Sequence, residues 1–395
     1  MSTDREVVIL SGVRTAIGDY GGSLKDMPAV DLAAAVVKEA VSRSGAKPED
    51  MGHCVFGNVI HTEARDMYLS RVAAINGGLP NEVPCFTLNR LCGSGLNAIV
   101  AGAQAILLGD CDSAVTGGAE NMSRGGYWLP SMRWGQRMAD GKVVDAMVGA
   151  LTDPFHQIHM GVTAENIAER WNISREEQDQ LAVESHQRAA RAQAEGRFDD
   201  QILPIELKTR KGTVTFNKDE HVRGDITLEG MAKLKTVFKK NGTVTAGNAS
   251  GINDAAAAVV LMERQAAEAK GLKPMARLVG YSFAGVEPEI MGIGPTPAIK
   301  KVLDKTGLSI ADMDVIELNE AFAAQALAVV KDLDLPTDKV NPNGSGISLG
   351  HPIGATGCLI TVKALYELQR TGGRYALISM CIGGGQGIAA VIERM

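Results

Sequence analysis

Short apolar runs alternate along the chain with longer segments in which apolar residues recur at helical spacing. The helical patterns cover residues 31–43 and 297–305. The apolar runs predict buried strands at residues 7–10, 55–59, 114–117, 276–279, 315–318 and 375–380. Residues 11–14 (SGVR) predict a turn after the first strand. Strands that alternate with helices are typical of an α/β fold with buried sheets.

The two ends of the chain share a pattern of turns. Residues 44–51 (SGAKPEDM) precede a predicted strand that ends at Asn58, and residues 306–313 (TGLSIADM) precede one that ends at Asn319. Cys92 follows the first asparagine by 34 positions, and a histidine follows the second by 32. We interpret the chain as two similar halves. Two unrelated α/β segments with similar turns are the alternative.

Residues 122–252, between these halves, have a different composition. They hold all three tryptophans, four of the seven histidines and a charged segment that predicts a helix. Ser174 and Glu177 match the N-cap and N3 positions of a capping box at the start of that helix. Residues 207–242 carry nine Lys and Arg against four Asp and Glu. This basic stretch is either a solvated surface or a site for the phosphates of an anionic ligand.

Charge and composition exclude several classes of protein. The net charge of −6 argues against general nucleic-acid binding. No apolar run is as long as the roughly 18 residues that a membrane span needs, and the N-terminus lacks the basic start of a signal peptide. The six cysteines form no Cys-x-x-Cys pair, which favours neither a zinc site nor a disulfide framework. We expect a cytoplasmic protein with no bound metal.

Cys92 lies in a Gly-rich segment, residues 89–95 (NRLCGSG), directly before apolar residues at helical spacing. The free N–H groups at a helix N-terminus stabilise a thiolate and can hold an oxyanion. We therefore expect the pKa of Cys92 to lie below the ordinary value of about 8.5. The alternative is a buried structural cysteine. That is our interpretation of Cys54, Cys85, Cys111 and Cys358.

Three further side chains near the C-terminus could take part in chemistry. His351 follows an Asn- and Gly-rich loop at residues 341–346 and could act as a base for Cys92. Cys381 precedes three glycines whose N–H groups could form an anion hole, although the two thiols could instead be a redox pair. Asn319, at a strand-to-helix turn, could hold a water or a carbonyl oxygen, or could simply cap the helix.

These motifs, in this order, resemble the thiolase family, the acetyl-CoA C-acetyltransferases, over the whole chain. Further matching segments are residues 14–18 (RTAIG), 117–123 (GGAENMS) and 247–254 (GNASGIND). The resemblance is strongest to bacterial short-chain β-ketothiolases of the polyhydroxyalkanoate-precursor type. It implies a reversible Claisen condensation of acetyl-CoA with an acyl-CoA to a 3-ketoacyl-CoA, with ping-pong kinetics.

The resemblance also implies a five-layered αβαβα fold with two similar halves and an inserted loop domain. The N-terminal thiolase domain would comprise residues 1–121 and 253–274. The loop domain, residues 122–252, would bind CoA and contribute contacts between subunits of a homotetramer. The C-terminal thiolase domain would comprise residues 275–395.

The catalytic roles follow from the same resemblance. Cys92 would accept the acyl group, and His351 would activate it. Cys381 would remove or return a proton at the acyl α-carbon. Asn319, through a water, and His351 would form one oxyanion hole. The backbone N–H groups of Cys92 and Gly383 would form the other.

The resemblance names acetyl-CoA, acyl-CoA and CoA as substrates, with no further cofactor. Arg223 would lie near the CoA nucleotide. The complete set of expected substrate-binding residues is Leu151, His159, Met160, Arg223, Ala246, Ser250 and Phe322. Two rival functions remain. A decarboxylating ketosynthase of the same fold uses a Cys-His-His set, which Cys381 argues against. A non-catalytic acyl-CoA binder would have lost Cys92 or His351.

Overall fold

The computed structural model describes residues 5–210 and 212–395, so Lys211 of the basic stretch lies outside the described residues. The N-terminal half builds a sheet in the order β4–β3–β5–β11–β1. Its strands are β1 (Val7–Thr15), β3 (Cys54–Gly57), β4 (Cys85–Leu88), β5 (Ser113–Asn121) and β11 (Asn253–Glu263). The short strands β2 (Gly18–Asp19) and β8 (Ile202–Leu203) pair with β11 and β1.

The C-terminal half repeats this arrangement in the order β13–β14–β15–β12. Its strands are β12 (Ala276–Gly285), β13 (Val315–Leu318), β14 (Tyr375–Ile382) and β15 (Gln386–Arg394). Ile316 of β13 also forms a parallel bridge with Val340. Val340 therefore lies beside β13 in the way that β4 lies beside β3 in the N-terminal half. The two sheets meet where β1 and β12 pair through Val8 and Ile9.

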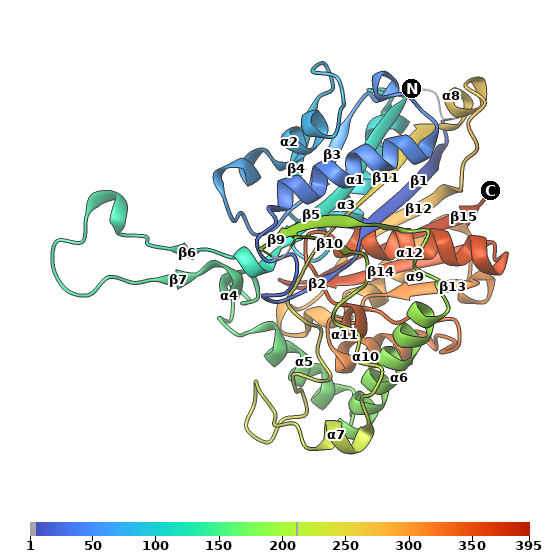
Figure 1. The fold of residues 1–395 in the computed structure, drawn as a ribbon. Coiled ribbons are helices and arrows are strands. Elements are labelled where there is room, and N and C mark those ends of the chain that lie inside the picture. The colour runs from blue at the N-terminus through green and yellow to red at the C-terminus, as the bar shows by residue number, and fades with distance from the viewer. Residues whose placement is uncertain (1–4, 211) are drawn as a thin grey trace.

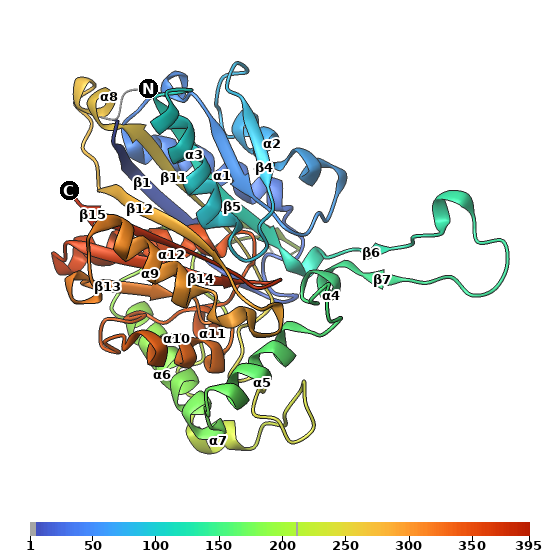
Figure 2. The same ribbon diagram turned by 180° about the vertical axis from the view of Figure 1, so that it is seen from behind.

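Helices complete five layers, seen in Figures 1 and 2. Helices α1 and α2 cover the outer face of the N-terminal sheet, and α9 and α10 lie on the outer side of the C-terminal half. Helices α3 and α12 pack together between the two sheets. The bounds of these six helices are α1 (Ala29–Ser44), α2 (Leu69–Asn76), α3 (Ser94–Leu108), α9 (Pro295–Thr306), α10 (Ala323–Leu333) and α12 (Thr356–Thr371). The αβαβα arrangement and the two similar halves are therefore confirmed.

The region between the halves lies below the sheets and beside them in Figure 1. A long arm that carries β6 and β7 projects away from the body. The elements of this region and the two remaining short helices are β6 (Tyr127–Trp128), β7 (Val144–Asp145), α4 (Ala146–Ala150), α5 (Met160–Arg170), α6 (Arg175–Ala194), β9 (Ile205–Thr209), β10 (Gly212–Phe216), α7 (Leu228–Ala232), α8 (Arg264–Ala269) and α11 (Gly346–Leu349). The predicted capping box of α6 is present, because Ser174 Oγ accepts from Glu177 N and Glu177 Oε2 accepts from Ser174 N.

Two local predictions were wrong. Residues 11–14 form no turn: β1 continues to Thr15 because these residues pair with β11, and the guanidinium of Arg14 is buried against Asp219. A window with the length and hydropathy of a membrane span also exists, at residues 91–108. Leu, Ile, Val and Ala residues give this window its apolar character, and its helix, α3, packs between the sheet and α12 inside the molecule.

Candidate active site

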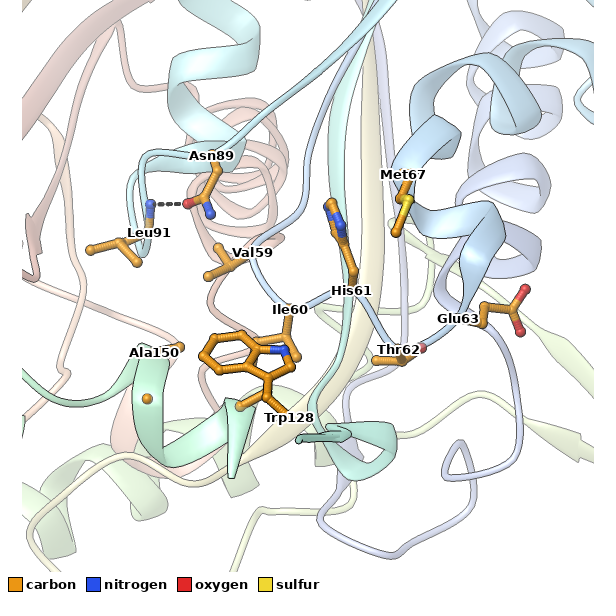
Figure 3. Close-up of a pocket in the computed structure, with 12 residues that line it drawn as sticks. Val59, Ile60, His61, Thr62, Glu63, Met67, Asn89, Leu91, Trp128 and Ala150 are labelled. Carbon is orange, nitrogen blue, oxygen red and sulfur yellow. Dashed lines mark hydrogen bonds between the residues drawn. The ribbon is translucent and has the colours of Figure 1, made fainter. Parts of the chain in front are cut away.

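The turn before α3 holds Cys92 in a constrained backbone. Leu91 has a φ of 46°, and Asn89 Oδ1 accepts from its N–H at 2.8 Å (Figure 3). Ser94 Oγ donates to Leu91 O and accepts from the N–H of Arg90. The α3 helix then begins at Ser94, so the prediction that Cys92 lies next to a helix N-terminus is confirmed.

Glycine is required where α3 meets α12. A Cβ at Gly95 would lie 2.7 Å from the backbone N of Cys358, and a Cβ at Gly357 would lie 2.2 Å from the backbone N of Leu96. These close approaches bring the N-terminal ends of the two central helices together. The residues that precede these ends, Cys92 and His351, thereby reach the same cavity.

The expected lowering of the Cys92 pKa was wrong for the free enzyme. Cys92 is half-buried at the cavity wall, and burial raises the pKa of its thiol to about 11. Hydrogen bonds from the backbone N–H groups of Gly383 and of Cys92 itself lower the pKa, but by less than burial raises it. The thiol is therefore neutral in the free enzyme and needs a base. The same two N–H groups are those expected to form an oxyanion hole.

His351 lines the same cavity as Cys92. Its Nδ1 lies 2.7 Å from Thr356 Oγ1, and Thr356 Oγ1 is 2.9 Å from Pro352 O. Because the threonine hydroxyl donates its one proton to the carbonyl, it must accept from the imidazole, so we assign the proton to Nδ1. Burial lowers the pKa of His351 to about 4, so the imidazole is neutral and its Nε2 is free to accept a proton.

Replacing Thr356 with valine should lower kcat by about ten- to a hundred-fold, or about 1.4–2.7 kcal/mol, because the imidazole loses the partner that fixes its tautomer. Thr361→Val is the matched control. Thr361 is buried in the same helix and makes the same type of bond, to Gly357 O, yet has no contact with the imidazole. Steady-state thiolysis with both variants tests the assignment, and equal losses would contradict it.

Asn319 and Cys381 lie at the ends of neighbouring parallel strands, β13 and β14. Asn319 Nδ2 is 3.4 Å from His351 Nε2. The alternative that Asn319 caps α10 is excluded, because the N-cap of this helix is Phe322. Cys381 is fully buried beside Met160, and burial together with the nearby Cys92 raises the pKa of its thiol. The thiol is therefore neutral at rest, and another group must take its proton before Cys381 can act as a base.

Sequence reasoning missed Glu120, the counterpart of Cys381 in the N-terminal half. Val115 of β5 pairs with the first residue of β3, and Ala376 of β14 pairs with the first residue of β13. Glu120 follows Val115 by five positions, and Cys381 follows Ala376 by five positions. The Glu120 carboxyl accepts from the N–H groups of Val59, Ile60 and Gly354 and from Asn58 Nδ2 at 2.8–3.1 Å. Burial raises its pKa to about 8. Glu120 therefore ties the loop that carries His351 to the N-terminal half.

A cavity of about 360 Å³ brings eight of the twelve predicted residues together, and its lining does not include Asn319, Cys381, Gly383 or Arg223. Those that line it are Cys92, Leu151, His159, Met160, Ala246, Ser250, Phe322 and His351. The lining residues that the sequence did not single out are Met122, Val237, Phe238, Ala249, Gly251, Ile252, Met291, Ala321 and Ile353. Several of these lie inside a matching segment, as Met122 does in residues 117–123, but Met291 is brought in only by the fold. The wall is mainly apolar, as expected for a site that takes a thin acyl and thioester chain.

His159 forms part of the wall on the loop-domain side. Its ring stacks on Phe238 at 4.7 Å between centroids, and its Nδ1 accepts from Gly161 N at the start of α5. Burial lowers its pKa. A neutral, stacked imidazole is suited to an uncharged part of a ligand.

Arg223 does not line this cavity. It lines an adjoining one of about 460 Å³ with His186 and His221, and Ala246 and Ala249 border both cavities. The Arg223 side chain is exposed. The pair of cavities thus provides an apolar inner part and a polar outer part.

A further cavity of about 480 Å³ lies at the base of the arm, on the other side of the Leu91 turn (Figure 3). Trp128 and Ile60 lie close together there, and Asn89 borders the same space.

In residues 5–210 and 212–395, no group of three His, Cys, Asp or Glu side chains is arranged to hold a metal ion.

Comparison with known proteins gives a result that covers nearly the whole chain. The thiolase N-terminal domain model matches residues 7–265, and the thiolase C-terminal domain model matches residues 272–394. The chain therefore belongs to the thiolase family.

Similar proteins span the full length of this thiolase. Beta-ketothiolase BktB from Cupriavidus necator is 65% identical over 99% of this chain and 100% of its own length. The acetyl-CoA acetyltransferase of Chromobacterium violaceum is 50% identical over 98% of this chain and 100% of its own. The crystal structure of human mitochondrial 3-ketoacyl-CoA thiolase is 46% identical, with a TM-score of 0.97 and coverage of 100% of both chains.

Proposed function

We propose that this enzyme is a short-chain β-ketothiolase that works through an acyl-Cys92 intermediate. The thiolase is an acyltransferase that acts on acetyl-CoA, acyl-CoA and CoA. The observation that carries the mechanism is one cavity with a neutral thiol, an imidazole whose Nε2 accepts a proton, and a second buried thiol beside them. Cys92, His351, Cys381 and Asn319 are the proposed catalytic side chains.

In the first half-reaction, His351 Nε2 takes the proton from Cys92, and the thiolate attacks the thioester carbonyl of acetyl-CoA. The N–H groups of Cys92 and Gly383 stabilise the tetrahedral oxyanion; one such donor lowers the barrier by about 3–4 kcal/mol. CoA leaves with a proton from the imidazolium, and the acetyl group stays on the sulfur. Release of the first product before the second substrate binds predicts ping-pong kinetics.

In the second half-reaction, His351 Nε2 takes the proton of the neutral Cys381 thiol, and the resulting thiolate removes a proton from the methyl group of a second acetyl-CoA. The enolate oxygen is stabilised by His351 Nε2–H and, through a water, by the Asn319 amide. The carbanion attacks the acyl-enzyme, and Cys92 leaves as a thiolate. Thiolysis of a 3-ketoacyl-CoA is the reverse of these steps.

Short acyl chains fit the cavity best. Beyond Cys92 the space is bounded by the bulky side chains of Met160, Met291 and Phe322, within a volume of about 360 Å³. CoA-dependent loss of acetoacetyl-CoA, 3-ketovaleryl-CoA and a 3-keto substrate with ten carbons tests this preference. We expect kcat/KM to fall at the longest chain; an equal or higher value would contradict a short-chain preference, and no activity with any substrate would contradict the proposed function.

Arg223 is proposed to bind the nucleotide phosphates of CoA from the outer cavity. Arg223→Ala should raise the KM for CoA about ten-fold and leave kcat nearly unchanged, because a phosphate contact acts equally on the ground and transition states. Arg210→Ala is the control, since Arg210 is exposed in the same basic stretch but lines neither cavity. Loss of kcat with an unchanged KM would place Arg223 elsewhere in the mechanism.

We also propose a homotetramer, a dimer of dimers, assembled through the arm of the loop domain at residues 122–252. The arm exposes large apolar side chains far from the body, among them Trp134 (87% exposed) and Met138 (86% exposed) (Figure 2). Exposed apolar groups of this size mark interaction surfaces. We also propose the division into an N-terminal domain, a loop domain and a C-terminal domain with the bounds stated in the sequence analysis. We propose a cytoplasmic location as well, because six free thiols fit a reducing compartment.

The combined substitution Trp134→Ser and Met138→Ser should convert the tetramer to dimers, because it removes the apolar groups from the contact. Mass measurement by light scattering after size-exclusion chromatography reads this out. Val214→Ser, at an exposed valine on β10, is the control and should remain tetrameric. A variant that keeps the wild-type mass would show that the arm does not hold the assembly.

A further inference from the structure

Cys54 and Cys85 face each other at the edge of the N-terminal sheet. Strands β3 and β4 are parallel, and these two residues are direct partners in their register. Neighbouring strands lie about 4.7–4.9 Å apart, within the Cα separation of roughly 4.4–6.8 Å that a disulfide bridges. The register therefore places Cys54 and Cys85 at a backbone spacing that a disulfide can bridge.

The environments of the two thiols differ. Cys54 is fully buried, and its Sγ accepts from Ser70 Oγ at 3.5 Å. Cys85 is half-buried, and Arg71 Nη1 lies 4.0 Å from its Sγ. The guanidinium is fixed in this place because it also donates to the carbonyl groups of Val83 at 2.8 Å and Asn81 at 2.9 Å. One thiol is reachable and lies beside a cation, and the other lies behind it.

Electrostatics single out Cys85 among the six cysteines, all of which lie in the described part of the chain. The Cys54 thiol and Arg71 lower the pKa of Cys85. The neighbouring Cys85 and burial raise the pKa of Cys54. Burial raises the pKa of the other four thiols, Cys92, Cys111, Cys358 and Cys381. Accessible thiolates beside a second cysteine are the pattern of peroxide-sensitive sites.

We propose that Cys85 and Cys54 form a peroxide-oxidised dithiol, distinct from the catalytic thiols. The Cys85 thiolate attacks one oxygen of hydrogen peroxide; a sulfenic acid forms and, with one proton, the other oxygen leaves as water. The Cys54 thiol then attacks the Cys85 sulfur and forms the disulfide, and the sulfenic oxygen leaves as a second water. Two thiols lose two electrons in total, and hydrogen peroxide gains them. A dithiol reductant reverses the change.

Oxidation at this place leaves Cys92 and Cys381 as free thiols. Strand β4 leads directly into the segment that carries Cys92, seven positions after Cys85. Oxidation of a catalytic thiol to a sulfenic acid would stop turnover. If Cys85 and Cys54 react with peroxide before Cys92 and Cys381 do, the catalytic thiols stay reduced.

Peptide mapping tests the proposal on the intact enzyme. Trypsin cleaves after Arg43, Arg65, Arg71, Arg90 and Arg124, and not at the Lys47–Pro48 bond. Cys54, Cys85 and Cys92 therefore fall on separate peptides, 44–65, 72–90 and 91–124. After one equivalent of hydrogen peroxide and alkylation of the remaining thiols, we expect peptides 44–65 and 72–90 to be joined and Cys92 to be alkylated. The joined pair should also form in the Cys92→Ser variant.

Variants separate this site from general thiol oxidation. Arg71→Met should slow the oxidation of Cys85 about ten-fold, the effect of raising a thiol pKa by one unit. Arg65→Met, at an exposed arginine that pairs with Glu63 and Asp31, should have no effect. Cys54→Ser should stop the reaction at the sulfenic acid, which dimedone traps on Cys85. The proposal is overturned if Cys92 oxidises before Cys85, or if Cys85 oxidises without joining Cys54 in the wild type.

Discussion

Replacing Cys92 with serine should lower the rate of CoA-dependent cleavage of acetoacetyl-CoA by at least about 10⁴-fold, or roughly 5.5 kcal/mol of barrier. The cause is proton transfer. Burial lowers the pKa of His351 to about 4, and so weak a base can deprotonate a thiol in step with attack but not a far less acidic hydroxyl. The substitution changes one atom, so the fold and the cavity should be kept. Circular dichroism and the melting temperature check that they are.

Cys111→Ser is the matched control for this variant. Cys111 is a half-buried thiol whose pKa is also raised by burial, and it lies outside the cavity. Its replacement should leave kcat within about two-fold of the wild type, since it touches neither substrate nor base. If Cys92→Ser kept substantial activity, the nucleophile would have to be another group.

Replacing Cys381 with alanine should separate the two half-reactions. The variant should still be acetylated at Cys92 by acetyl-CoA, because that step uses His351 and the N–H groups of Cys92 and Gly383. It should lose condensation by about 10³-fold, within the range for a general base. Exchange of the methyl protons of acetyl-CoA with deuterium in D₂O should fall to the same extent, and NMR measures this exchange directly.

Cys358→Ala is the control for the second thiol. Cys358 is as fully buried as Cys381, but it lies in α12 and does not line the cavity. Its loss removes a buried sulfur and should lower stability without stopping proton exchange. Normal condensation by Cys381→Ala would show that another base removes the α-proton.

Much of the fold could be predicted because hydrophobic periodicity marks strands that are buried on both faces. The prediction ended strands too early where the side chains are small or polar. Strand β5 continues through Glu120 to Asn121, and β11 begins with Asn, Asp and four alanines, which carry little strand signal. These polar and small residues are buried because a central helix layer lies on them, which no local pattern reveals.

Motifs were enough to propose the catalytic positions, but they did not reveal the electrostatics of these side chains. The helix N-terminus next to Cys92 predicts a lowered pKa, and only the three-dimensional burial shows why the pKa is raised instead. The tautomer of His351 depends on Thr356 and Pro352, whose roles appear once the turn is folded. Glu120 lies in the matching segment 117–123, but its equivalence to Cys381 in the repeat appears only through strand register.

The acyl-enzyme is the central claim, and mass analysis of the tryptic peptides after incubation with acetyl-CoA tests it most directly. We predict one acetyl group on peptide 91–124, placed on Cys92 by fragmentation, and its removal when free CoA is added. The acetyl group should be absent from this peptide in Cys92→Ser and present in Cys111→Ser. Turnover of acetoacetyl-CoA with no acetyl group on Cys92, or with the label on another residue, would contradict the account.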